Sequence, residues 1–194
     1  DDLEQNVKML ENSIRMLDFF QEKGDFLSQV LEKPDLVTEN PTEFILAVET
    51  SGYVSPPNIS VSTYNSLNLN GDRLIFRDKE LLYALTDYYN EIAASPLRAG
   101  APTELLMMNF EYVAGILTYD QVKEINIKGP LYADYYYSVE EASAAYERMM
   151  DQPEFIDFLQ RRAARHGFRY RVYVNWLDQA KNLRDKVKQK LDKE

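Results

Sequence analysis

The stretch that decides the fold covers residues 152–191 and reads QPEFIDFLQRRAARHGFRYRVYVNWLDQAKNLRDKVKQKL. Side chains suited to a buried face recur there in steps of three and four: Phe155, Leu159, Ala163, His166, Tyr170, Tyr173, Leu177, Ala180, Leu183, Val187 and Leu191. This spacing places them on one face of a single α-helix. At 1.5 Å per residue the helix would be roughly 60 Å long. Gly167 costs about 1 kcal/mol relative to alanine there and marks a place for a kink.

A second long helix opens the chain. Its apolar positions follow in steps of four, three, four and three: Leu3, Val7, Leu10, Ile14 and Leu17. The apolar content continues to Pro34, and Gly24 marks a bend or a short break. Both stripes are too narrow to be buried all round and too long to stand alone in water. We therefore expect the two helices to pack antiparallel, with the first stripe facing residues 176–191.

Shorter helices fill the middle of the chain. Asn40 followed by Pro41 is typical of a helix start, and Asp78 is a second N-cap, of a helix that runs to Pro96. Further helices are expected from about residue 102 to 117 and, behind the Ser138–Glu141 capping box, to about residue 150. Residues 119–130 are interpreted as a connection. The sequence thus predicts an all-α helical bundle forming a single domain over residues 1–194.

Residues 60–77 allow two interpretations. The pair Asn70-Gly71 between short apolar runs is a hairpin signal, which would give a small hairpin at residues 66–76. In the alternative, Ser62 or Thr63 caps two helical turns and Gly71 ends them. Local sequence alone leaves both open.

Composition excludes several classes of function. The chain has 194 residues and no cysteine, which excludes disulfide scaffolds, thiol nucleophiles and cysteine-based metal sites. One histidine excludes sites that need two, and a net charge of −10 argues against nucleic-acid binding. No apolar run is long enough to span a membrane. We expect no cofactor, no metal ion and no nucleic-acid partner.

A resemblance to a known family lies in residues 63–89, which read TYNSLNLNGDRLIFRDKELLYALTDYY. They resemble a family of uncharacterised bacterial proteins with one N-terminal membrane helix followed by an extracytoplasmic helical domain. The shared pattern is Thr-aromatic-x-x-Leu, a glycine turn, a short apolar run, a polar cap and a helix ending in Tyr-Tyr. Residues 2–6 also resemble the segment just after the membrane anchor in that family. The resemblance implies an anchored, outward-facing module without catalytic residues, and it favours a helix over residues 63–69.

The candidate ligand or partner patch is aromatic. It comprises Tyr132, Tyr135, Tyr136 and Tyr137, which are close in sequence, together with the lone histidine His166. Tyrosine clusters suit half-buried contact surfaces because an apolar ring carries a polar hydroxyl. Packing across the bundle explains the tyrosines equally well, and a lone histidine on an apolar stripe is usually a core residue.

The basic C-terminal stretch is a second candidate surface. Residues 161–194 hold 11 Lys and Arg against 4 Asp and Glu, while residues 1–160 hold 11 against 28. The basic residues near the end are Lys181, Arg184, Lys186, Lys188 and Lys190. They would contact either the acidic body of the protein, or anionic lipid headgroups or an acidic partner.

These observations favour a non-enzymatic interaction or sensory module on a membrane-anchored bacterial protein. It would be anchored in the inner membrane by a segment upstream of Asp1 and face the periplasm or cell exterior. It would bind a protein partner or pair as a homodimer. The alternative is a small-molecule-binding protein or hydrolase with an inter-helix pocket near the tyrosine cluster.

Overall fold

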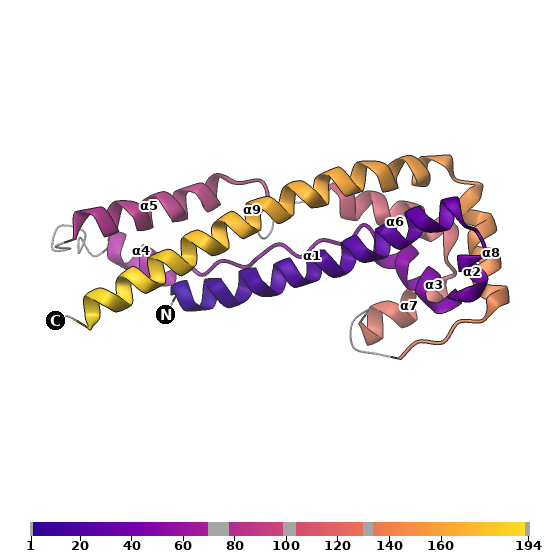
Figure 1. Ribbon diagram of the computed structural model, residues 1–194, viewed down its shortest axis with the longest axis horizontal. Coiled ribbons are helices and arrows are strands. Elements are labelled where there is room, and N and C mark those ends of the chain that lie inside the picture. The colour runs from indigo at the N-terminus through magenta and orange to yellow at the C-terminus, as the bar shows by residue number, and fades with distance from the viewer. Residues whose placement is uncertain (1, 70–77, 99–103, 130–133, 193–194) are drawn as a thin grey trace. The chain divides into compact units, whose positions relative to one another are not determined.

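The computed structural model describes residues 2–69, 78–98, 104–129 and 134–192, and these contain helices and no strand. The all-α prediction is confirmed (Figure 1). In chain order the helices of the described residues are α1 (Asp2–Glu32), α2 (Leu36–Glu39), α3 (Pro41–Thr50), α4 (Ser62–Leu69), α5 (Lys79–Ala94), α6 (Glu104–Ile116), α7 (Tyr119–Lys128), α8 (Val139–Met150) and α9 (Pro153–Leu191).

The chain divides into two compact units, each assembled from separate stretches of sequence. Unit 1 consists of Asp1–Arg15, Ser55–Pro102 and Phe168–Glu194. Unit 2 consists of Met16–Val54 and Thr103–Gly167. The two long helices α1 and α9 each contribute one segment to both units. The prediction of a single domain over residues 1–194 stays a prediction.

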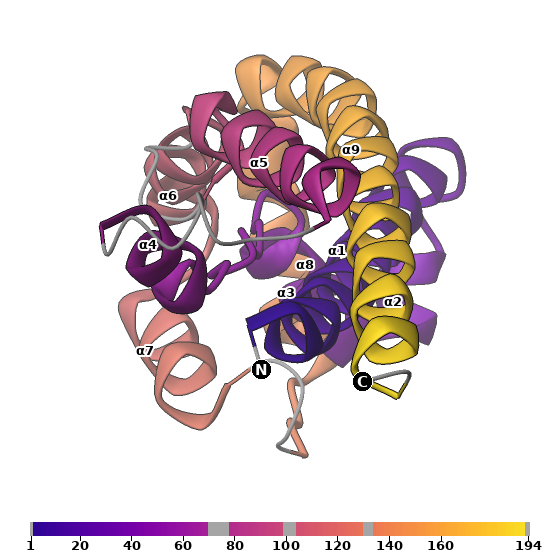
Figure 2. The same ribbon diagram turned by 90° about the vertical axis from the view of Figure 1, so that its left-hand side faces the viewer.

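In unit 1, four helical segments form a ring: α1, α4, α5 and α9 (Figure 2). The segment of α9 packs on that of α1, where Lys181 pairs with Glu11 at 2.9 Å. The start of α1 and the end of α9 lie at the same end of this unit, so the helices are antiparallel, as predicted (Figure 1). Direct side-chain contacts also join α1 to α4, α4 to α5, and α5 to α9.

In unit 2, α3 is the central helix and packs against α2, α6, α7 and α8. It is apolar almost all round, and Phe44, Ile45, Ala47 and Val48 are completely buried. A helix that is apolar on every side has to be covered on every side. The core around it also takes side chains from α1, α8 and the start of α9.

Polar residues occupy several buried positions on or beside the predicted stripes. On α9, the predictions for Ala163 and Tyr170 are wrong, because both residues are exposed while the neighbouring Arg162 and Arg169 are buried. On α1, Val7, Leu10 and Leu17 are buried as predicted, while Leu3 and Ile14 are half-buried. The buried face of α1 also includes the polar residues Asp2, Asn6 and Ser13. Apolar periodicity does not find these positions, because it follows hydrophobic side chains only.

Two local predictions are wrong. Residues 119–128 form helix α7 instead of a connection, and a capping box between Thr118 and Gln121 starts it. Asn40 precedes α3 without a side-chain capping bond, although Pro41 does open the helix. By contrast, the Ser138–Glu141 capping box and the Asp78 cap are both formed as expected.

The helical alternative for residues 62–69 is confirmed by α4. Residues 66–69 therefore do not form the first arm of a hairpin, and residues 70–77 lie outside the described residues. Among the described helices, none combines the length and apolarity required to cross a membrane.

Candidate functional site

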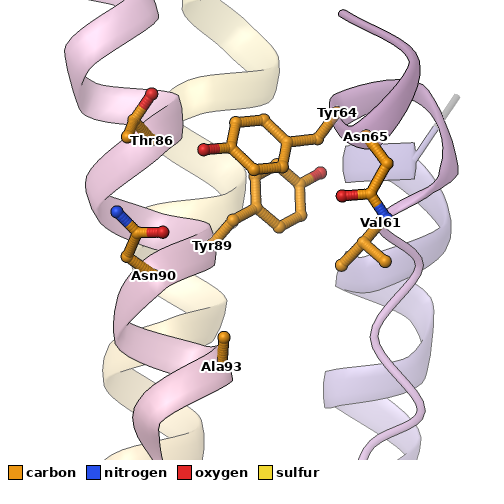
Figure 3. A pocket seen from close by; sticks show the side chains of 7 residues that line it. All are labelled: Val61, Tyr64, Asn65, Thr86, Tyr89, Asn90 and Ala93. Atoms are coloured by element: carbon orange, nitrogen blue, oxygen red, sulfur yellow. The ribbon is translucent and has the colours of Figure 1, made fainter. Parts of the chain in front are cut away.

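A groove of about 440 Å³ opens between α4 and α5 in unit 1 (Figure 3). This volume lies within the range of small-ligand sites, about 300–1,000 Å³. Thr86, Asn90 and Ala93 line it from α5, opposite Val61 and Asn65, and the rings of Tyr64 and Tyr89 overlap between the two walls. We call this feature the α4–α5 groove.

Two polar residues of α1 hold the α4 wall. The first is Asp2, whose carboxylate accepts hydrogen bonds from the Ser60 and Ser62 hydroxyls, both at 2.9 Å, and from the Thr63 N–H at 2.8 Å. It thereby supplies an acceptor at the start of α4, where backbone N–H groups lack helical partners. Burial alone would raise the pKa of Asp2, but these hydrogen bonds outweigh it and hold the pKa below its ordinary value.

The second is Asn6, which fixes the segment that leads into α4. Its side-chain carbonyl accepts from the Ser60 N–H at 2.6 Å, and its amide donates to the Ser60 carbonyl at 3.0 Å. Asn6 is completely buried. One side chain thus satisfies both backbone groups of Ser60, two residues before α4 begins.

The α5 wall is held by α9 on its other side. Glu91 accepts hydrogen bonds from the Trp176 indole N–H at 3.0 Å, from Asn175 at 3.2 Å and from Gln179 at 3.0 Å. Trp176 itself is 1% exposed. Both walls of the groove therefore rest on named side-chain contacts within unit 1.

The two tyrosines form the closed part of the groove. Their ring centroids are 4.5 Å apart and the ring planes are inclined by 22°, so Tyr64 and Tyr89 are stacked. Tyr64 is 9% exposed and Tyr89 is 5% exposed. Burial, followed by the nearby Asp2 carboxylate, raises the pKa of Tyr89 above its ordinary value, so its hydroxyl stays protonated.

The groove is lined by neutral side chains. Its lining residues contribute two amides, hydroxyl groups and apolar surface, and none of them carries a carboxylate, an imidazole or an amine. Nor do the described residues anywhere contain a group of three or more His, Asp and Glu suited to holding a metal ion.

A separate buried polar cluster lies at the end of α3 in unit 2. Glu49 is completely buried, and its Oε1 accepts from the Tyr53 hydroxyl at 2.6 Å and from Asn126 at 3.2 Å. Asn109, also completely buried, accepts from the Gly52 N–H at 3.1 Å and donates to the Glu49 carbonyl at 2.7 Å. Burial raises the pKa of Glu49, and the bonds from Tyr53 and Asn126 only partly counter it.

Arg162 is the second buried charge of unit 2. Its side chain is 0% exposed and donates to the Phe20 carbonyl at 3.2 Å and the Ser51 carbonyl at 3.5 Å, with the Asp25 carboxylate 3.7 Å away. Burial lowers its pKa, an effect that Asp25 partly offsets. The guanidinium occupies the space beside Gly24, where a Cβ atom would lie 1.8 Å from the Arg162 Cζ. Gly24 therefore makes room for Arg162 and does not break α1.

The structure brings two of the predicted patch tyrosines together against α7. Tyr135 and Tyr137 stack with centroids 6.2 Å apart; Tyr135 donates to the Gly129 carbonyl and Tyr137 to Glu124. Tyr136 is 87% exposed, and Tyr132 lies outside the described residues. His166 is 2% exposed on the buried face of α9.

The basic residues at the end of α9 are partly paired within unit 1. Lys181 pairs with Glu11, Arg184 with Asp185 at 2.9 Å, and Lys190 with Asp78 at 2.7 Å. Lys186 and Lys188 are exposed. The pairs of Lys181 and Lys190 favour the interpretation in which the basic stretch complements the acidic body, whereas Arg184 pairs within the stretch itself.

The groove residues do not stand out in the sequence. In the sequence, Tyr89 is one of the regularly spaced residues on the apolar face of a predicted helix, and Asn65 and Asn90 resemble ordinary surface residues. The available signal is the pair of aromatic residues at positions 64 and 89. Only the packing of α4 on α5 brings them together.

Comparisons of the chain with known protein families, with curated proteins and with solved structures gave no match. Function therefore has to be inferred from the geometry of the chain itself.

Proposed function

We propose that this protein is a non-enzymatic binding module whose ligand occupies the α4–α5 groove. The observation that carries the proposal is the lining: a groove of ligand size, with walls held by hydrogen bonds and a surface of neutral polar and apolar side chains. The alternative of a hydrolase needs convergent carboxylates or a nucleophile with its base, and the lining supplies neither. In this proposal the module recognises its ligand and does not transform it.

The proposed binding site is not the pocket that the sequence suggests near residues 132–137. That tyrosine cluster belongs to unit 2, where Tyr135 and Tyr137 direct their hydroxyls to partners within the protein. The groove belongs to unit 1, where Asn65 and Asn90 are exposed.

A pair of tryptophan substitutions on α5 tests the proposal. Ala93 is exposed and lines the groove, whereas the neighbouring Ala94 is exposed and does not line it. Ala93→Trp should fill the groove, and Ala94→Trp is the matched control. Saturation-transfer NMR with a library of uncharged fragments should find fragments that bind the wild type and Ala94→Trp but not Ala93→Trp. A library that yields no such fragment would contradict the proposal.

We extend the proposal to location: the module belongs to a membrane-anchored bacterial protein and faces the periplasm or cell exterior. The support is the resemblance of residues 63–89 to the extracytoplasmic domains of the bacterial family. Fractionation of cells that express the native gene should recover the protein with the inner membrane, and added protease should digest this domain once the outer membrane is opened. Recovery in the cytosol would contradict this part.

A further inference from the structure

The lining of the α4–α5 groove is neutral in a strongly acidic protein. The chain carries a net charge of −10, yet none of the residues that line the groove is charged. A charged group that entered the groove would give up part of its contact with water, and no lining residue would supply an opposite charge in return. The ligand is therefore expected to be uncharged where it lies in the groove.

The tyrosines argue against ligands that are recognised by stacking. Nucleobases and many sugars bind on the open face of an aromatic ring. The faces of Tyr64 and Tyr89 are turned to each other at 4.5 Å, and both residues are almost fully buried. These rings shape the groove and keep it apolar at its closed side, but they stack on each other instead of on a ligand.

The exposed polar groups of the groove include two side-chain amides. Asn65 lies on the α4 wall and Asn90 on the α5 wall (Figure 3). Each amide offers one carbonyl acceptor and an NH₂ donor, the complement of the N–H and C=O of a peptide group. Val61 and Ala93 add small apolar surfaces beside them.

Two asparagines among the described residues each bind both an N–H and a C=O of the backbone through one side-chain amide. Asn6 binds both the N–H and the C=O of Ser60, and Asn109 binds the Gly52 N–H and the Glu49 C=O. In both cases the side-chain carbonyl accepts and the side-chain NH₂ donates. Asn65 and Asn90 present this chemistry at the surface.

We propose that the α4–α5 groove binds the main chain of an uncharged, extended peptide segment through Asn65 and Asn90. This inference rests on the proposed binding function of the groove and names its ligand class. Recognition through the main chain implies tolerance of many neutral sequences, since the contacts do not involve the ligand's side chains.

Isothermal titration calorimetry with a capped pentapeptide, acetyl-Ser-Ala-Ser-Ala-Ser-amide, tests the inference. The matched ligand is the same peptide methylated on its backbone nitrogens, which removes the donors. We expect the methylated peptide to bind about tenfold more weakly. Asn65→Ala and Asn90→Ala should each raise the Kd about three- to tenfold, the effect of one lost hydrogen bond. Asn182→Ala, an exposed asparagine on α9, should leave it unchanged.

Equal binding of both peptides, or an unchanged Kd in both groove variants, would overturn the peptide inference. The screen of uncharged fragments described above separates this result from failure of the proposed function. If fragments bind and Ala93→Trp abolishes that binding, the groove is a binding site for a different class of ligand. If neither the peptide nor any fragment binds in a manner that Ala93→Trp abolishes, both the inference and the proposed function are wrong.

Discussion

Replacing Gly24 with alanine should destabilise this protein, although the same change stabilises most helices. In an unobstructed helix interior, alanine is favoured over glycine by about 1 kcal/mol. Here the new Cβ would lie 1.8 Å from Cζ and 1.9 Å from Nη2 of Arg162, far inside van der Waals contact. Either α1 or the guanidinium has to move.

The magnitude depends on the contacts that this movement disrupts. Overpacking a well-filled site costs about 1–3 kcal/mol. A displaced Arg162 would also weaken its bonds to the Phe20 and Ser51 carbonyls, and hydrogen bonds to charged groups contribute about 1.5–3 kcal/mol each. With about 2 kcal/mol for overpacking, about 2 kcal/mol for the two weakened hydrogen bonds together, and the helix-propensity gain of about 1 kcal/mol subtracted, we expect a net loss of about 3 kcal/mol. At about 2–4 °C per kcal/mol for a chain of this size, Tm should fall by roughly 6–12 °C.

A double-mutant cycle assigns the loss to this contact. Circular dichroism during urea and thermal unfolding should be recorded for the wild type, Gly24→Ala, Arg162→Met and the double variant. In the Arg162→Met background, methionine can bend away, so Gly24→Ala should be neutral or stabilising by up to about 1 kcal/mol. If Gly24→Ala alone is as stable as the wild type, or equally destabilising in both backgrounds, the inferred contact is wrong.

Three further predictions concern stability. Asn6→Ala should lower the free energy of unfolding by about 2 kcal/mol because both backbone groups of Ser60 lose their partner; urea unfolding measures this, and the exposed Gln5→Ala is its control. Leu10→Ala should cost about 2–5 kcal/mol in the same assay, since Leu10 is 0% exposed, and a loss below about 1 kcal/mol would show that the α1–α9 seam is not a core. Glu49→Gln should be more stable than the wild type at about pH 8. Burial raises the pKa of Glu49 in the folded state, so the wild type loses stability as the pH rises from the unfolded-state pKa of Glu49 through its folded-state pKa. The stability advantage of Glu49→Gln over the wild type should therefore shrink in acid. A stability difference that grows in acid would contradict the raised pKa.

The helices were largely predictable because their signals are local. Steps of three and four residues predict α1 and α9 almost to their ends, and the Asp78 and Ser138 caps predict the starts of α5 and α8. Helix α7 departs from the prediction because Gly129-Pro130 suggests a break, whereas the Thr118–Gln121 capping box that starts the helix is a weaker signal in sequence.

The buried polar residues and the groove could not be predicted in the same way. Arg162 is buried because a glycine lies opposite it, and Asp2 is buried because it caps another helix. Each depends on a partner far away in sequence, which periodicity does not reveal. Likewise Tyr64 and Tyr89 meet only where α4 packs on α5, and Asn6 helps to fix the segment before α4.

The most direct test of the proposed binding site is to map the bound ligand by NMR. Nitrogen-15 spectra of the assigned protein should be recorded while the capped pentapeptide is added. We expect the largest shifts at Val61–Asn65, at Thr86–Ala93 and in the side-chain NH₂ pairs of Asn65 and Asn90. Largest shifts at Tyr135–Tyr137 in unit 2, with the α4–α5 groove unchanged, would contradict the assignment of the groove as the binding site.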